Sequence, residues 1–138
     1  MENLDKDGDG IICLFAVIIR DKKVLLGLRN YTADKWKDIS VWTAPGGRSE
    51  KGETLRETLT REVKEEVDIT DLKIEKFLGE TPGAKEGDVV HLYLCSTGQE
   101  AKLMEPEKFS EWRWFGANEI PENFINKSGL RIINKLLV

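Results

Sequence analysis

The sequence predicts an α/β fold of the α+β kind, in which a mixed β-sheet lies between helices. Most periodic segments are short and apolar, as strands are, whereas only two segments have a helical period, one in mid-chain and one at the end. The 138 residues suffice for one domain with a substantial core but not for two. We expect a single domain over residues 11–138, preceded by a flexible polar leader at residues 1–10.

The composition, with 40% hydrophobic and 33% charged residues, is that of an ordinary globular protein. A net charge of −4 implies no broad basic surface, so we expect no extended nucleic acid as a partner. The N-terminus lacks the positive charge of a signal peptide, and the apolar run at residues 11–19 is too short to span a membrane. We therefore expect no membrane partner, a cytoplasmic location, and reduced core thiols at Cys13 and Cys95.

The leader contains the sequence DKDGDG at residues 5–10, which looks like the first half of a calcium-binding EF-hand loop. The twelfth position of such a loop should be a bidentate glutamate, and here it is Ala16. The residues that follow are also strand-like rather than helical. We therefore favour a frayed polar segment over a calcium site.

The first half of the domain begins with a predicted hairpin. Residues 11–20 are apolar on both faces, as expected of a strand that is covered on both sides, and residues 24–28 return as its partner. A polar loop follows at residues 30–39 and carries Tyr31 and Trp36. These aromatic side chains could stack on a base, or they could pack the loop onto the body of the domain.

The mid-chain helix is the clearest local feature. Residues 41–44 form a short strand that runs into Gly46 and Gly47, which permit a tight turn and close backbone approach. Thr54 and Glu57 then form the pattern of a capping box, which predicts a helix from Leu55 to about Val67. Its apolar stripe, which must face the core, consists of Leu55, Leu59, Val63 and Val67.

Three carboxylates, Glu62, Glu65 and Glu66, fall on one side of this helix, next to the apolar stripe. Glu62 and Glu66 repel each other, and Glu65, Glu66 and Asp68 crowd the negative end of the helix dipole. A divalent cation would remove both penalties, and oxygen ligands without nearby His or Cys suit Mg²⁺, with Mn²⁺ as a substitute. The alternative is an ordinary solvated helix, supported by a pair between Glu57 and Arg61 four residues apart.

The second half of the domain contains strands at residues 72–80, 89–97 and 112–115, and a helix capped by Ser128 that ends near Leu137. In the second of these strands, apolar residues alternate with His91, Tyr93 and Cys95. His91 and Tyr93 could line a base pocket or fill a half-polar face of the sheet. A Glu-rich polar loop at residues 98–110 precedes the last strand.

Gly47, Glu53 and the run from Arg61 to Ile69 resemble the Nudix box, the signature of the Nudix hydrolases. The box asks for Gly, five residues, Glu, seven residues, and then Arg-Glu-apolar-any-Glu-Glu-any-Gly-apolar. The one departure is Asp68 in place of the late glycine, and Asp tolerates the left-handed conformation of a helix stop better than most residues. The resemblance implies the Nudix α/β/α sandwich, with the mixed sheet between helices.

The resemblance also implies roles for individual residues. Glu65 and Glu66 would be metal ligands together with the Gly46 carbonyl, and Glu62 would be a further ligand or the base that deprotonates the attacking water. Arg61 would orient this cluster, and Glu53 would hold Arg61 by an ion pair. The candidate substrate-binding residues are Arg29 as a phosphate contact, Gly47, Tyr31, Trp36, and Glu107 or Glu111 as a contact to metal or base. For Arg29, Glu107 and Glu111 the alternative is simple solvation.

The short chain and its EWRWF ending resemble MutT-like nucleoside triphosphate pyrophosphatases. The function implied is Mg²⁺-dependent hydrolysis of a standard, oxidised or non-standard nucleoside triphosphate to a monophosphate and pyrophosphate, by a monomer or homodimer. One alternative is a nucleotide-sugar or ADP-ribose pyrophosphatase. Such relatives are often marked by a proline some distance beyond the box, and Pro82 matches the position of that proline poorly. Another is a non-catalytic nucleotide-binding module, a class that tends to have lost the box carboxylates, all of which are present here.

Overall fold

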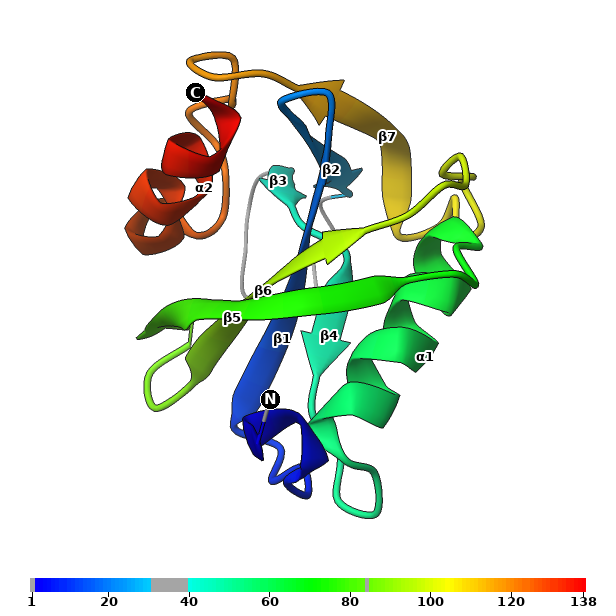
Figure 1. The fold of residues 1–138 in the computed structure, drawn as a ribbon, viewed down its shortest axis with the longest axis vertical. Helices are drawn as coiled ribbons and strands as arrows, with labels where there is room; N and C mark the ends of the chain where they lie inside the picture. Colours follow the sequence, from blue (N-terminus) through cyan, green and yellow to red (C-terminus); the bar gives the residue numbers. More distant parts are fainter. Residues whose placement is uncertain (1, 31–39, 84) are drawn as a thin grey trace.

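The structure is a computed structural model, and residues 2–30, 40–83 and 85–138 are described (Figure 1). Within these ranges, two α-helices lie on opposite sides of a seven-stranded mixed sheet, as the sequence predicts. None of the helices in these ranges is long and apolar enough to cross a bilayer. The strands are β1 Ile12–Arg20, β2 Lys23–Arg29, β3 Val41–Thr43, β4 Gly46–Arg48, β5 Lys73–Pro82, β6 Val89–Ser96 and β7 Phe109–Phe115; the α-helices are α1 Leu55–Val67 and α2 Leu130–Leu137, and two short 3-10 helices are η1 Glu2–Asp5 and η2 Lys127–Gly129.

Strand β1 is the centre of the sheet, whose order is β3-β2-β1-β6-β5. It pairs antiparallel with β2 and β4 and parallel with β6, and β7 pairs with β2. Both faces of β1 are covered, since Leu14 packs in the cluster beneath α1 and Val17 in the cluster beneath α2. The apolar character of residues 11–20 therefore reflects burial on both sides, as predicted.

Helix α1 has the predicted bounds and caps. Thr54 accepts a hydrogen bond from the Glu57 N–H, and the Glu57 carboxylate accepts one from the Thr54 N–H at 2.9 Å, which completes the capping box. The four residues of the apolar stripe are fully buried. The helix ends at Asp68, which has φ 57° in the left-handed region, as we expected of the residue that replaces the box glycine.

Three of the predicted boundaries differ in the structure, and in two of them a partner distant in the chain decides the boundary. Residues 46–48 form a strand, β4, because they pair with β1. Strand β7 begins at Phe109, opposite Arg29 of β2, rather than at residue 112. The cap of the last helical segment is Asn126, not Ser128, since the Asn126 side chain accepts a hydrogen bond from the Gly129 N–H.

The N-terminal segment packs against the domain, contrary to the flexible leader that we expected. Leu4 is 0% exposed and belongs to the core cluster beneath α1. The Gly8 N–H donates to the Glu53 carbonyl, and the Lys6 carbonyl accepts from the Leu55 N–H. The sequence suggested a frayed segment because most of its residues are charged or glycine, whereas one buried leucine and backbone hydrogen bonds to distant residues attach the segment.

Candidate active site

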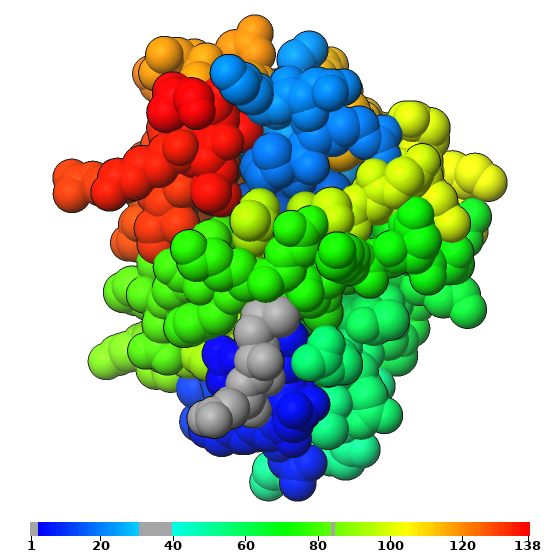
Figure 2. Space-filling view, viewed as in Figure 1, coloured from blue at the N-terminus to red at the C-terminus, as the bar shows by residue number. Residues whose placement is uncertain are grey.

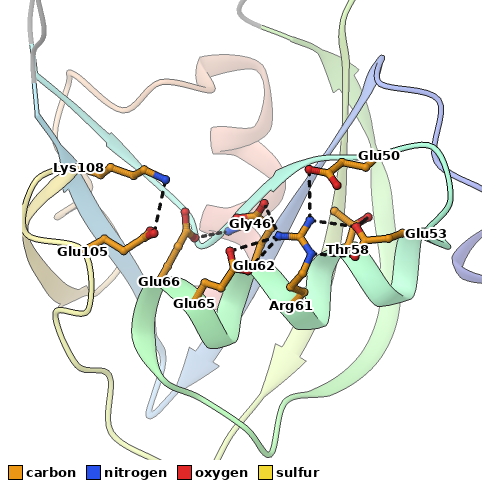
Figure 3. Close-up of polar contacts among 10 residues, drawn as sticks. All are labelled: Gly46, Glu50, Glu53, Thr58, Arg61, Glu62, Glu65, Glu66, Glu105 and Lys108. Carbon is orange, nitrogen blue, oxygen red and sulfur yellow. Dashed lines mark hydrogen bonds and ion pairs between the residues drawn. The ribbon is translucent and has the colours of Figure 1, made fainter.

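Two adjacent glycines allow α1 to approach strand β4. Gly46 has φ 148°, and a Cβ atom there would lie 1.8 Å from the Leu14 carbonyl oxygen. A Cβ atom on Gly47 would lie 2.7 Å from Cδ of Glu62. Position 46 therefore requires glycine, whereas a side chain at position 47 would displace Glu62. The Gly46 N–H reaches the Glu66 carboxylate at 2.9 Å (Figure 3).

Glu66 is a buried carboxylate without a cationic partner. It is only 5% exposed, and no Lys or Arg among the described residues lies within ion-pair distance of it. Burial raises the pKa of Glu66 to about 8, and the nearby carboxylates Glu62 and Glu105 act in the same direction. The Gly46 hydrogen bond and the charge of Arg29 lower this pKa in part. Such a group is costly for the fold unless it binds a proton or a cation.

Arg61 is surrounded by carboxylates (Figure 3). Its Nε and Nη2 atoms donate to both oxygens of Glu53 at 2.8 and 3.0 Å, which confirms the predicted ion pair. Its Nη1 atom contacts Glu62 and Glu65, each at 3.2 Å. The predicted pair between Arg61 and Glu57 is wrong, because the Glu57 carboxylate is engaged in the capping box.

The electrostatics of this group follow from these contacts. The hydrogen bond from Arg61 lowers the pKa of Glu53, and that contact in turn raises the pKa of Arg61. Burial raises the pKa of Glu62, an effect that Arg61 opposes and Glu65 reinforces. Arg61 thus holds Glu62 and Glu65 in place while its own charge is anchored by Glu53.

The loop that precedes β7 brings a fourth carboxylate to the cluster. The backbone N–H groups of Lys102 and Met104 donate to the Val67 and Glu66 carbonyls at the end of α1. Glu105 is thereby placed near enough to Glu66 to raise its pKa, and it pairs with Lys108 at 3.5 Å (Figure 3). Sequence reasoning placed Glu105 in the Glu-rich loop but did not select it, because only the docking of that loop on α1 distinguishes it.

Neither of the two glutamates that the sequence favoured makes an ion pair with Arg61 or with Lys108. Glu107 is exposed, and it forms no ion pair with any residue in the described ranges. Glu111 lies on β7 and pairs with Arg113 at 2.5 Å. Glu105, rather than either of these, is the residue that the structure places beside Glu66.

Among the other predicted substrate contacts, Arg29 is at the end of β2, with its guanidinium over the ring of Phe109 at 5.8 Å. Its charge acts on Glu66, so it lies near the carboxylate cluster. Tyr31 and Trp36 lie outside the described residues.

The donor set suits a hard divalent cation, although the carboxylates are not gathered around one point. Within the described ranges, no three His, Cys, Asp or Glu side chains stand together in a metal-binding arrangement. Glu62 and Glu65 are instead drawn to Arg61, Glu105 to Lys108, and Glu66 to the Gly46 N–H. The observation that favours a bound cation is Glu66, which is buried, has no Lys or Arg partner among the described residues, and lies near the carboxylates of Glu62 and Glu105.

A cavity of about 450 Å³ lies on the α2 side of the sheet. Apolar residues of β1, β3, β5 and β6 form part of its wall, and Arg48, which follows Gly47 on β4, also lines it. Arg48 makes two hydrogen bonds to the Asp88 carboxylate, at 2.9 and 2.6 Å. Strand β4 therefore contacts the carboxylate cluster through Gly46 and the cavity through Arg48. The lining residues include Cys13, Phe15, Val41, Val90, Phe124, Asn126, Lys85 and Lys127.

His91 and Tyr93 do not line this cavity. Tyr93 is fully buried in the core beneath α1, and His91 Nε2 lies 2.8 Å from the Glu80 carboxylate. Both rings pack against Phe77. His91 and Tyr93 therefore fill a face of the sheet, as the sequence favoured, and they do not line the cavity.

Comparison with known proteins supports the resemblance. The family model described as NUDIX domain matches residues 13–136. The NAD-capped RNA hydrolase NudC of Vibrio atlanticus is 27% identical over 80% of this chain, and the CTP pyrophosphohydrolase of Escherichia coli is 31% identical over 56% of it. The chain spans 39% and 55% of the lengths of these relatives. The crystal structure of a MutT NUDIX hydrolase from Burkholderia pseudomallei has the same fold, with a TM-score of 0.69, 23% identity, and coverage of 92% of this chain and 97% of that one.

Proposed function

Since the chain belongs to the Nudix family, whose domain model matches residues 13–136, we propose that it hydrolyses a phosphoanhydride bond of a nucleoside triphosphate. The products would be a nucleoside monophosphate and pyrophosphate. The observation that carries the proposal is the carboxylate cluster on α1, with Glu66 buried and unpaired beside the Gly46 N–H.

Phosphoanhydride cleavage needs the negative charge of the phosphates neutralised, a water activated, and the phosphorus held in line with that water. Glu62, Glu65, Glu66, Glu105 and the Gly46 carbonyl are the groups that would hold Mg²⁺, or Mn²⁺ in its place. The bound metal would neutralise phosphate oxygens and acidify a coordinated water.

The protein's own groups supply the remaining functions in this proposal. Glu62, half-buried and with a raised pKa, is suited to accept the proton of the attacking water. Arg61 keeps Glu62 and Glu65 in position and is itself fixed by Glu53. Lys108 lies on the side of the cluster away from Arg61 (Figure 3), and the charge of Arg29 acts on Glu66, so both cations are proposed to contact the phosphates.

The cavity beside β4 is the proposed site of the nucleoside. Its wall is partly apolar, as a site for a base and sugar requires, and its rim carries Arg48, Lys85 and Asn123. Tyr31 and Trp36 remain proposed stacking partners. A cytoplasmic location is part of the proposal and is supported by two cysteines that form no disulfide.

The test is hydrolysis of a panel of nucleotides with Mg²⁺, by the natural sequence and by the Glu66→Gln variant. We expect release of pyrophosphate and a monophosphate, with a loss in kcat of at least about 100-fold on replacement of Glu66. Glu75→Gln, a change at an exposed position on β5, is the matched control and should leave kcat unchanged.

Other outcomes would select the alternatives. Formation of AMP and a phosphorylated sugar from ADP-ribose, without cleavage of triphosphates, would identify a nucleotide-sugar pyrophosphatase. Tight binding of a nucleotide that is never cleaved would identify a binding module and end the enzymatic proposal.

A further inference from the structure

The N-terminal segment, residues 2–10, runs beside the loop that connects β4 to α1. The Gly8 N–H donates to the Glu53 carbonyl at 2.8 Å, and the Leu55 N–H donates to the Lys6 carbonyl at 2.9 Å. These two bonds flank an antiparallel β-bridge between the segment and the loop. The end of the loop and the first residue of α1 are thus bound to the segment through the backbone.

The close approach of the two backbones requires glycine at position 8. A Cβ atom on Gly8 would lie 2.3 Å from the Glu50 carbonyl oxygen and 2.7 Å from the Glu50 nitrogen. The φ angle of Gly8 is not in the left-handed region, so the requirement comes from this contact and not from backbone conformation. Any side chain at this position would push the loop and the segment apart.

Both ends of the segment are attached to the domain. At one end Leu4 is fully buried in the core cluster beneath α1, and Figure 2 shows the segment (dark blue) lying against the start of that helix (blue-green). At the other end the Ser49 hydroxyl accepts hydrogen bonds from the N–H groups of Asp9 and Gly10, at 3.3 and 3.2 Å. Because both ends are fixed, the bonds between them constrain the position of the loop.

Glu53 connects this constraint to the carboxylate cluster. Its carbonyl accepts from Gly8, and its carboxylate accepts from Nε and Nη2 of Arg61 at 2.8 and 3.0 Å. Arg61 in turn contacts Glu62 and Glu65, each at 3.2 Å (Figure 3). A misplacement of about 1 Å in such a cluster can lower a rate by about 100-fold, even when its cause is remote from the chemistry.

We propose that the N-terminal segment positions Glu53 and, through it, Arg61, with Gly8 as the positioning residue. The proposal rests on the proposed function, since it assigns a catalytic consequence to the position of Arg61. The alternative is that the segment only stabilises the fold through Leu4. The two differ in one respect, because a positioning role requires the Glu53 side chain to transmit it.

The first test is the rate at which the Arg61 Nε proton exchanges with solvent, measured by NMR without metal or nucleotide. Glu53 binds this proton in the structure, so its exchange should be slow in the natural sequence. We expect exchange at least about 10-fold faster in the Gly8→Ala variant, because the bond that is displaced is one between charged groups. Gly98→Ala is the control and should leave the rate unchanged, since a Cβ atom there would have its nearest neighbour at 3.5 Å.

The second test is a double-mutant cycle on nucleotide hydrolysis. Gly8→Ala should lower kcat at least about 10-fold and leave KM within about 2-fold, because Gly8 is not among the residues that line the cavity. In the Glu53→Ala background the same change should alter kcat by less than about 2-fold, since the side chain that transmits the effect is absent. A role in stability alone gives the same factor in both backgrounds.

Leu4→Ala is a second variant, which loosens the segment without introducing a clash and serves if Gly8→Ala does not fold. Below its unfolding transition, followed in urea, it should also speed the exchange of the Arg61 proton and lower kcat. Leu4→Met, which retains an apolar side chain of similar volume, should restore both.

Two results would overturn the proposal. These are an unchanged Arg61 exchange rate in both folded variants, and an equal loss of kcat with and without the Glu53 side chain. Faster Arg61 exchange in a protein that cleaves no nucleotide would support the positioning role while the hydrolase proposal fails. A natural sequence that cleaves nucleotides, with kcat retained in both variants, would do the reverse.

Discussion

Replacement of Glu66 by glutamine should remove a pH dependence of folding stability that the buried carboxylate creates. Burial raises the pKa of Glu66 to about 8 from its ordinary value of 4.5. Between these values the folded protein retains a proton that the unfolded chain has released, so the free energy of unfolding falls as the pH rises. Linkage gives a loss of about 3 to 4 kcal/mol between pH 5 and pH 8 without metal.

The assay is urea unfolding at intervals from pH 5 to pH 8 in the presence of a chelator. Glutamine keeps the acceptor for the Gly46 N–H but cannot titrate, so the Glu66→Gln variant should lack this decline. Comparison of the two proteins cancels the contributions of the groups that they share. An identical decline in both proteins would refute the assignment of a raised pKa to Glu66.

Mg²⁺ supplies a second arm of this experiment. A metal that binds the ionised cluster should restore stability at pH 8, by about 2.7 kcal/mol when its concentration is 100 times its dissociation constant. The variant without Glu66 should gain much less. Equal stabilisation of the two proteins by Mg²⁺ would place the metal away from Glu66.

Three further changes test individual contacts. Leu4→Ala should lower the free energy of unfolding, measured in urea, by about 2 to 4 kcal/mol, because Leu4 is fully buried. The control Ile11→Ala, at a half-exposed position, should lower it much less. Equally small effects of the two changes would support a flexible leader. Gly47→Ala should lower kcat at least about 10-fold in a steady-state assay, since the new Cβ displaces Glu62; unchanged kcat would show that this contact is not needed. Asp68→Gly should stabilise the protein by about 0.5 kcal/mol in urea by relief of the left-handed backbone, and a loss of stability would contradict that cost.

Much of the fold follows from patterns that are local in the chain. The capping box and the apolar stripe predict both ends of α1, because the groups that decide them lie within a few residues of one another. The alternation in β6 likewise predicts which of its residues share a face, and the structure shows which face lies beneath α1 and which beneath α2. The Glu53–Arg61 ion pair came from the resemblance to the Nudix box, and the structure contains it.

The sequence by itself therefore determined the helix, the central strand and the identity of the carboxylates on α1, since each depends on short-range spacing. Only the tertiary structure decided the partners of charged groups that meet across distant segments. The backbone of the loop before β7 selects Glu105 over Glu107 and Glu111, and Arg48 pairs with Asp88, which is 40 residues away. Burial, hydrogen bonds and strand pairing between distant segments decide such choices, and no local pattern encodes them.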